Sequence, residues 1–274
     1  MFEEYDTMQI HKENVRWEKA NNVIESEWVK RYGNQRLFEL SSEDMQETLS
    51  YLNCNGLSDS DWFVVFHPRW SSDDLGRNSG DELRFEPAIK EIVNRGGWVI
   101  RLGVGYPPSK IRMERFIDYA GSGWRSENLD IGLIAKAKFL LGAASGPSDI
   151  AALFGTRVLR TNASQIGANV FRQGSLDIPT ILVPFNEDIK ESTIGFRKQL
   201  ALGYLDVNHK PGGFEYRSNT PDEIQSAVCE MLENETEKSA DQTEVERMIE
   251  SRGYYPTTTV SAYFIRKHEQ YFKM

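Results

Sequence analysis

Residues 62–183 alternate between short apolar runs and longer stretches whose apolar residues recur at helical spacing. The runs WFVVF (62–66) and FLLGA (139–143) are too short for a helix and are rich in residues that favour strands. Between such runs, segments like 85–94 place their apolar residues on one helical face and stop at Gly96–Gly97. Strands and helices that alternate in this way form βαβ units, so we predict an α/β fold with a mainly parallel, Rossmann-like sheet and helices on both faces.

The segments on either side of this alternation are expected to be helical. We expect an N-terminal helical extension over 1–57, a Rossmann-like domain over 58–234, and a C-terminal helical segment over 235–274 that packs on the domain. Within the first part, Ser41 and Asp44 form a potential capping box for a helix. A chain of 274 residues can bury a full core and needs no disulfide or metal for stability.

The charge and the cysteine content exclude several classes of protein. A net charge of −9 argues against a nucleic-acid-binding protein, which needs a basic surface. The two cysteines and four histidines show no zinc-ligand spacing and no disulfide framework, so we expect no metal site and a reducing compartment. The charged N-terminus lacks the apolar core of a secretory signal, and no apolar run approaches the roughly 18 residues of a membrane span. These features predict a cytoplasmic protein.

The first predicted strand ends in the tripeptide His67-Pro68-Arg69. In open α/β sheets, ligands bind beyond the carboxyl ends of the strands. An arginine at this place either binds a phosphate with two parallel hydrogen bonds from its guanidinium or forms a surface ion pair. His67 is either a hydrogen-bonded structural residue or a direct participant in the reaction.

The predicted strand WVIRL contains Arg101 and is followed by Gly103 and Gly105. Glycines at a strand end let a ligand approach the backbone closely. The third glycine and the following helix of a dinucleotide-binding fingerprint are missing, so neither NAD nor FAD is expected as a cofactor.

The predicted strand FLLGA is followed by SGPSD (145–149). Gly146 allows a tight turn, and Pro147 suits the first position of a helix. Free N–H groups at such a helix start bind anions, and the hydroxyls of Ser145 and Ser148 add donors. The alternative is an ordinary strand-to-helix turn with a serine cap. The residues around Ser145 do not match the G-x-S-x-G motif of hydrolases.

Two further segments carry polar residues near predicted strands. Thr161-Asn162 follows the strand 157–161 and either contacts a sugar or base or caps a turn. Asp59-Ser60-Asp61 has a D-x-D pattern but precedes a strand, so we interpret it as a turn and not as a metal site. No phosphate-binding loop of the GxxxxGK[ST] type is present.

Taken together, several of these segments resemble the donor-binding half of GT-B-type glycosyltransferases, and in particular bacterial glycosyltransferases of surface-polysaccharide loci. The matching segments are His67-Pro68-Arg69, Arg77-Asn78, GWVIRLG (97–103), IDYA (117–120) and Ser145-Gly146 before FGTRV (154–158). The H-x-R motif is also similar to one in fucosyltransferases, where its arginine is expected to hold the sugar-nucleotide phosphates. The resemblance covers residues 38–272, with departures at Trp70, which replaces a charged group, and at Arg157, which replaces a proline.

The resemblance implies metal-independent transfer of a sugar from a nucleotide-sugar donor to a glycan or lipid-linked acceptor in polysaccharide biosynthesis. The domain over 58–234 would bind the donor, and His67 and Arg69 would act in catalysis. The donor-binding residues would be Arg77, Asn78, Arg101, Gly103, Ser145, Gly146, Pro147, Ser148, Asp149 and Asn162.

Residues 1–57 are too few for the complete acceptor domain of a GT-B enzyme. The alternative is therefore a non-catalytic donor-binding or scaffolding subunit that pairs with another transferase chain or with a second copy of itself. A sugar-nucleotide epimerase is a third interpretation, but it needs the dinucleotide that the glycine pattern does not support. An enzyme that acts on lipid-linked acceptors could also sit at the inner face of the membrane.

Overall fold

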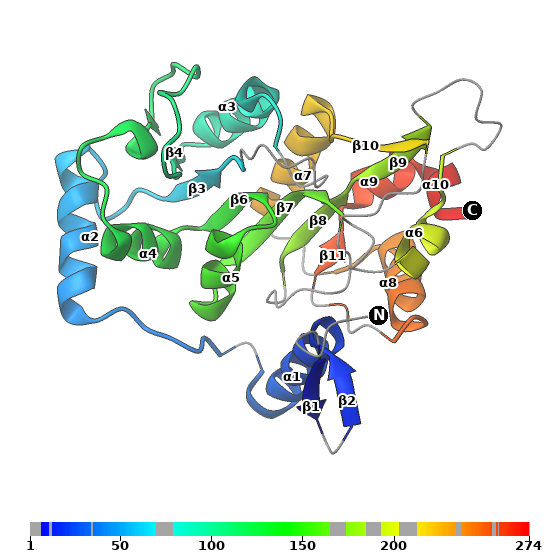
Figure 1. The fold of residues 1–274 in the computed structure, drawn as a ribbon. Coiled ribbons are helices and arrows are strands. Elements are labelled where there is room, and N and C mark those ends of the chain that lie inside the picture. The colour runs from blue at the N-terminus through cyan, green and yellow to red at the C-terminus, as the bar shows by residue number, and fades with distance from the viewer. Residues whose placement is uncertain are drawn as a thin grey trace.

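The computed structural model describes residues 7–10, 13–33, 35–69, 79–164, 174–184, 193–202, 213–233, 237–253, 256 and 258–273. Its centre is a seven-stranded sheet with the order β11-β8-β7-β6-β3-β4-β5, and each neighbouring pair is parallel (Figure 1). The strands are β3 (Phe63–His67), β4 (Trp98–Arg101), β5 (Phe116–Ile117), β6 (Phe139–Ala143), β7 (Arg157–Ala163), β8 (Leu176–Pro179) and β11 (Thr259–Val260). The α/β fold with a parallel sheet is thus confirmed.

Helices cover both faces of the sheet, as predicted. The first face carries α3 (Glu86–Asn94), α7 (Pro221–Glu233), α8 (Ala240–Glu250), α9 (Ala262–Lys267) and α10 (Glu269–Lys273), and the second carries α2 (Ser42–Cys54), α4 (Glu127–Lys136) and α5 (Gly146–Leu153). Since successive strand residues point to opposite faces, Val64 and Phe66 of β3 join the first core and Phe63 and Val65 join the second. A strand buried on both sides reads as a continuous apolar run, which is why WFVVF and FLLGA were recognisable.

The N-terminal part contains a strand pair that its sequence did not indicate. The hairpin of β1 (Thr7–Ile10) and β2 (Glu13–Arg16) is antiparallel and precedes α1 (Trp17–Tyr32), and both lie beside the layered body (Figure 1). The predicted cap of α2 is present, since the Asp44 backbone N–H donates to Ser41 Oγ at 3.0 Å. Helix α2 belongs to the core of the second face, where it packs against α4.

The C-terminal part contributes to the sheet as well as covering it. Val260 of β11 pairs with Asp177 of β8, which adds an edge strand, and the helices α8 to α10 fill the first core. Gln242 of α8 donates from its side-chain amide to the Val260 carbonyl at 3.0 Å and so secures this strand. Two further strands, β9 (Ile181–Pro184) and β10 (Phe214–Arg217), form a separate antiparallel pair, and α6 (Phe196–Leu202) packs into the first core.

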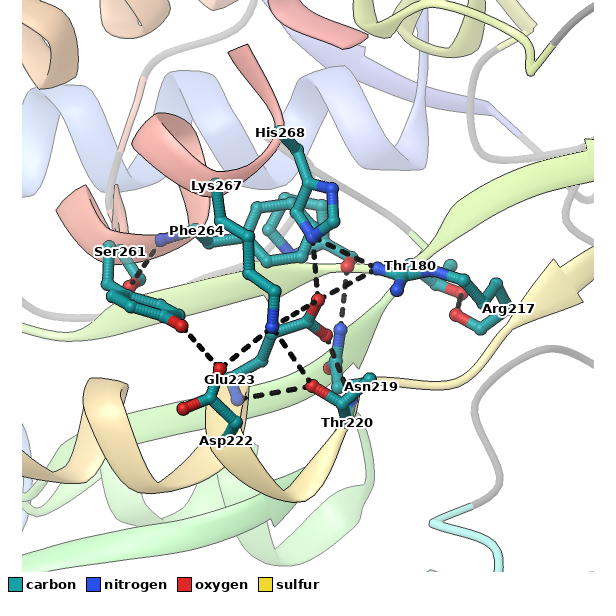
Figure 2. A network of polar contacts seen from close by, with 12 residues as sticks. Thr180, Arg217, Asn219, Thr220, Asp222, Glu223, Ser261, Phe264, Lys267 and His268 are labelled. Atoms are coloured by element: carbon teal, nitrogen blue, oxygen red, sulfur yellow. Dashed lines mark hydrogen bonds and ion pairs between the residues drawn. The ribbon is translucent and has the colours of Figure 1, made fainter. Parts of the chain in front are cut away.

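A polar network ties α9 to the start of α7 (Figure 2). We call it the Glu223 network, and its members are Arg217, Asp222, Glu223, Lys267 and His268. Glu223 Oε1 lies 2.6 Å from His268 Nε2 and 3.0 Å from Arg217 Nη2, and Asp222 Oδ2 lies 2.8 Å from Lys267 Nζ. Because the Glu223 side chain is fully buried, its charge depends on these partners.

Among the residues described, no helix has both the length and the apolar character that crossing a bilayer requires.

Candidate functional site

The strand order reverses between β3 and β6. From β3 the chain continues to β4 and β5 on one side, and from β6 it continues to β7, β8 and β11 on the other. In open α/β sheets, the crevice for ligands lies outside the carboxyl ends of the two strands at such a reversal. His67 is the last residue of β3 and is paired with Gly142 of β6. The reversal therefore falls on two of the segments that the sequence indicated.

His67 and Ser145 meet at this point of the sheet. Ser145 lies two residues beyond β6, and its Oγ is 3.2 Å from His67 Nδ1. The two strands approach so closely that a side chain at Gly142 would collide with the His67 carbonyl oxygen. The glycine in FLLGA thus permits the contact between residues that are 78 positions apart in the chain.

The His67 imidazole is neutral at physiological pH. Burial lowers the pKa of His67, and the positive charges of Arg69 and Arg101 lower it further, to about 4. Only 8% of the residue is exposed, so water offers little stabilisation to the protonated ring. A neutral imidazole has one nitrogen that donates and one that accepts a hydrogen bond.

Arg69 follows β3 and is half-buried beside His67. Its backbone is held by Ser79, whose Oγ accepts from the Arg69 N–H at 2.8 Å and whose N–H donates to the Arg69 carbonyl at 2.9 Å. These two bonds hold the Arg69 backbone beyond the carboxyl end of β3. The predicted donor-binding residues Arg77 and Asn78 lie outside the described residues.

Arg101 lies at the same edge, but its guanidinium faces carboxylates of the protein. Its Nη1 is 2.7 Å from Asp118 Oδ1, its Nε is 3.2 Å from Glu82 Oε2, and both terminal nitrogens donate to the Pro107 carbonyl at 3.2 Å. The residue is 3% exposed, and a buried cation requires such partners. This differs from the expectation that Arg101 reaches a diphosphate. Its contacts instead fasten the loop after β4 to the sheet.

The loop that Arg101 holds carries Tyr106, which the sequence did not indicate. The Tyr106 ring centroid lies 6.3 Å from that of His67 and 5.5 Å from Arg101 Cζ. Gly103 has a φ of 156°, and a side chain there would collide with the Tyr106 ring. Gly103 therefore serves to seat an aromatic ring beside His67, and the G-x-G pattern followed by an aromatic residue was the available signal.

The five predicted site residues in the turn from β6 into α5, 145–149, differ in exposure and in their contacts. Ser148 is fully buried, and its Oγ donates to the Ala143 carbonyl at 3.2 Å, so this hydroxyl stabilises the turn. Gly146 and Asp149 are exposed, and Pro147 is half-buried in the first helical turn. Among the described residues outside the turn, no atom lies within 4 Å of the position that a Gly146 side chain would occupy. The described residues therefore leave the start of α5 uncovered next to Ser145.

Asn162 serves another part of the structure. Its side-chain oxygen accepts from the Asn219 N–H at 2.8 Å, and its own N–H donates to the Asn219 side chain. Asn219 also donates to the Pro179 carbonyl at 2.8 Å. Asn162 thus joins the end of β7 to the segment before α7, and its contact with a sugar or base stays a prediction. Among the described residues, no three His, Cys, Asp or Glu side chains gather as a metal site would require.

A cavity of about 800 Å³ lies at the opposite edge of the sheet. Its lining includes Lys138, which precedes β6, and Arg157, which begins β7, together with Arg36. These positions are at the amino ends of the strands, so the cavity is separate from the contact between His67 and Ser145.

No family model and no curated protein matches this chain. Similar solved structures include a glycosyl transferase family 9 protein from Veillonella parvula DSM 2008, with a TM-score of 0.49 and 13% identity over 72% of this chain and 54% of that one. Another is the ADP-heptose LPS heptosyltransferase II of E. coli, with a TM-score of 0.36 and 16% identity over 45% of this chain and 38% of that one. The chain thus spans about half of the first structure and less of the second. Likeness at this level assigns neither an activity nor a residue role to this chain.

Proposed function

We propose that this chain binds the diphosphate of a nucleotide-sugar donor in the crevice between the ends of β3 and β6, and that it transfers the sugar to a glycan or lipid-linked acceptor. The observation that carries the proposal is the contact of His67 with Ser145, beside Arg69 and the open start of α5, where the strand order reverses. The transfer reaction itself comes from the motifs shared with GT-B-type glycosyltransferases.

The crevice has the groups that a diphosphate needs. At the start of α5, Pro147 has no N–H and the Ser148 N–H already donates to the Ser145 carbonyl at 2.9 Å, so we expect the helix to contribute mainly through the positive potential of its dipole at Gly146. Arg69 supplies a full positive charge near His67. Groups arranged in this way also stabilise the negative charge that develops on a departing diphosphate, with no metal ion required for that purpose.

We expect the Arg69 side chain to contribute strongly to the binding of the nucleotide. A hydrogen bond to a charged group contributes about 1.5–3 kcal/mol, so Arg69→Ala should weaken binding of a nucleoside diphosphate about 10- to 100-fold. Calorimetry with UDP, GDP and CMP identifies the preferred nucleotide and measures the loss of affinity in Arg69→Ala. Lys90→Ala, on the exposed side of α3, is the matched control for removal of a positive charge. Binding to Arg69→Ala that equals binding to the unchanged chain would refute the assignment.

A donor-binding subunit without activity of its own is the second candidate. The described residues contain one seven-stranded sheet, while a GT-B enzyme places donor and acceptor on two domains. The two candidates differ in what the purified chain does with a nucleotide sugar that it binds. Slow hydrolysis of the nucleotide sugar favours the enzyme, whereas binding without hydrolysis favours the subunit.

A further inference from the structure

We propose that Ser145 is a positioning residue that holds His67 in the tautomer with its proton on Nδ1, so that Nε2 accepts the proton of the sugar acceptor. The inference rests on the proposed function for its chemical role. The tautomer of His67 does not depend on that role, and it can be measured without any nucleotide.

The Ser145 hydroxyl has two partners. Its Oγ lies 3.1 Å from the Ala143 carbonyl oxygen and 3.2 Å from His67 Nδ1. A hydroxyl has a single proton to donate, and a carbonyl oxygen can only accept. If Ser145 donates to Ala143, its oxygen can only accept from the ring, so Nδ1 must carry the proton. The opposite arrangement would leave two oxygens facing each other at 3.1 Å with no proton between them.

The second step concerns the other ring nitrogen. A neutral imidazole carries one proton, so a proton on Nδ1 leaves Nε2 with a free lone pair. Among the described residues, Nε2 of His67 has no hydrogen-bond partner, whereas Nδ1 has Ser145. Since a group that accepts a proton in the reaction must not already be engaged in the protein, Nε2 is the nitrogen suited to that role.

The transfer step balances with this assignment. The acceptor hydroxyl oxygen forms a bond to the anomeric carbon of the donor sugar, and its proton passes to Nε2 of His67. The bond between the anomeric carbon and the diphosphate oxygen breaks, and its electron pair leaves with the diphosphate. The imidazolium then carries its second proton until it is released to water. Ser145 contributes by keeping Nε2 unprotonated beforehand.

The tautomer is measurable by nitrogen-15 NMR of the ring, because protonated and unprotonated ring nitrogens differ widely in chemical shift. The chain has only four histidines, and a His67→Gln variant assigns the signal. We expect a protonated Nδ1 and an unprotonated Nε2 at pH 7 in the unchanged chain. Ser145→Ala should move the proton to Nε2, whereas Ser145→Thr, which keeps the hydroxyl, should leave it on Nδ1.

Ser148→Ala is the matched control for this experiment. Ser148 donates to the same Ala143 carbonyl, and the hydrogen bond of His67 Nδ1 is to Ser145 and not to Ser148, so its removal should leave the tautomer unchanged. With a donor and an acceptor that react, Ser145→Ala should lower kcat about 100-fold, and Ser145→Thr should restore most of it.

A proton on Nε2 in the unchanged chain would overturn the proposal without any variant. A proton that remains on Nδ1 of His67 in Ser145→Ala would overturn the proposal as well. Either result leaves nucleotide binding untouched, so it is distinct from a failure of the proposed function, which would appear as the absence of nucleotide affinity.

Discussion

Replacement of Glu223 by glutamine should lower the free energy of unfolding by about 3 kcal/mol at pH 7. Burial by itself raises the pKa of this carboxyl group, but hydrogen bonds from His268 and the Thr220 backbone, with the charge of Arg217, outweigh it and lower the pKa from 4.5 to about 2. A tenfold change in an ionisation equilibrium is worth about 1.4 kcal/mol, which gives about 3 kcal/mol in favour of the folded state. Glutamine keeps the shape and loses the charge that Arg217 and His268 face.

The sign of the pH dependence follows from the lowered pKa. An acid with a lower pKa in the folded state stabilises the fold above its unfolded pKa, and this contribution is lost as the pH falls toward the folded pKa. The stability difference between the unchanged chain and Glu223→Gln should therefore be full at pH 7 and should shrink below about pH 4.5.

Urea unfolding at pH values from 7 to 3 measures this difference. Asp222→Asn is the matched control, because that carboxylate belongs to the same network but its side chain is 60% exposed. Its loss should cost less than about 1 kcal/mol, as is usual for exposed ion pairs. If Glu223→Gln unfolds within about 0.5 kcal/mol of the unchanged chain at pH 7, or if the gap stays constant down to pH 3, the reasoning is wrong.

Two further predictions concern packing. Arg160 and Asp177 form a fully buried ion pair between β7 and β8, with Nε and Oδ1 2.9 Å apart. Arg160→Met should cost about 3–5 kcal/mol in urea unfolding, and adding Asp177→Leu should recover most of that loss, because no buried charge is then unpaired. Gly132→Ala should lower the thermal midpoint, because the new side chain would collide with the Thr48 hydroxyl between α4 and α2 and overpacking costs about 1–3 kcal/mol. The control is Gly123→Ala, where no atom of the described residues outside its chain neighbours lies within 4 Å of the new side chain, and it should leave the midpoint unchanged.

The sheet was predictable from the sequence where its strands are long and buried. WFVVF and FLLGA correspond to β3 (Phe63–His67) and β6 (Phe139–Ala143), because strands covered on both faces are apolar throughout. The two-residue strand β11 shows no periodicity of its own. It is held by its pairing with β8 and by the hydrogen bond from Gln242 to Val260, and neither contact is visible in a local pattern.

The candidate site was predictable only as far as the strand ends. His67 and Ser145 were each recognisable from their own segments, since strand ends in such sheets face ligands. Their contact depends on the register of β3 against β6, which no local pattern contains. Arg101 likewise reads as a free cation in the sequence, because its partners Glu82 and Asp118 come from segments that only the fold brings to it.

The pairing of Arg101 also changes where the positive charge of the crevice comes from. Two carboxylates already balance this guanidinium, so it can offer little net attraction to a diphosphate. In a chain with a net charge of −9, we expect attraction at this edge to include the start of α5 and Arg69. Arg101 holds the loop that seats Tyr106 beside His67. The affinity for a nucleoside diphosphate should therefore respond to Arg69 through charge and to Arg101 through the order of that loop.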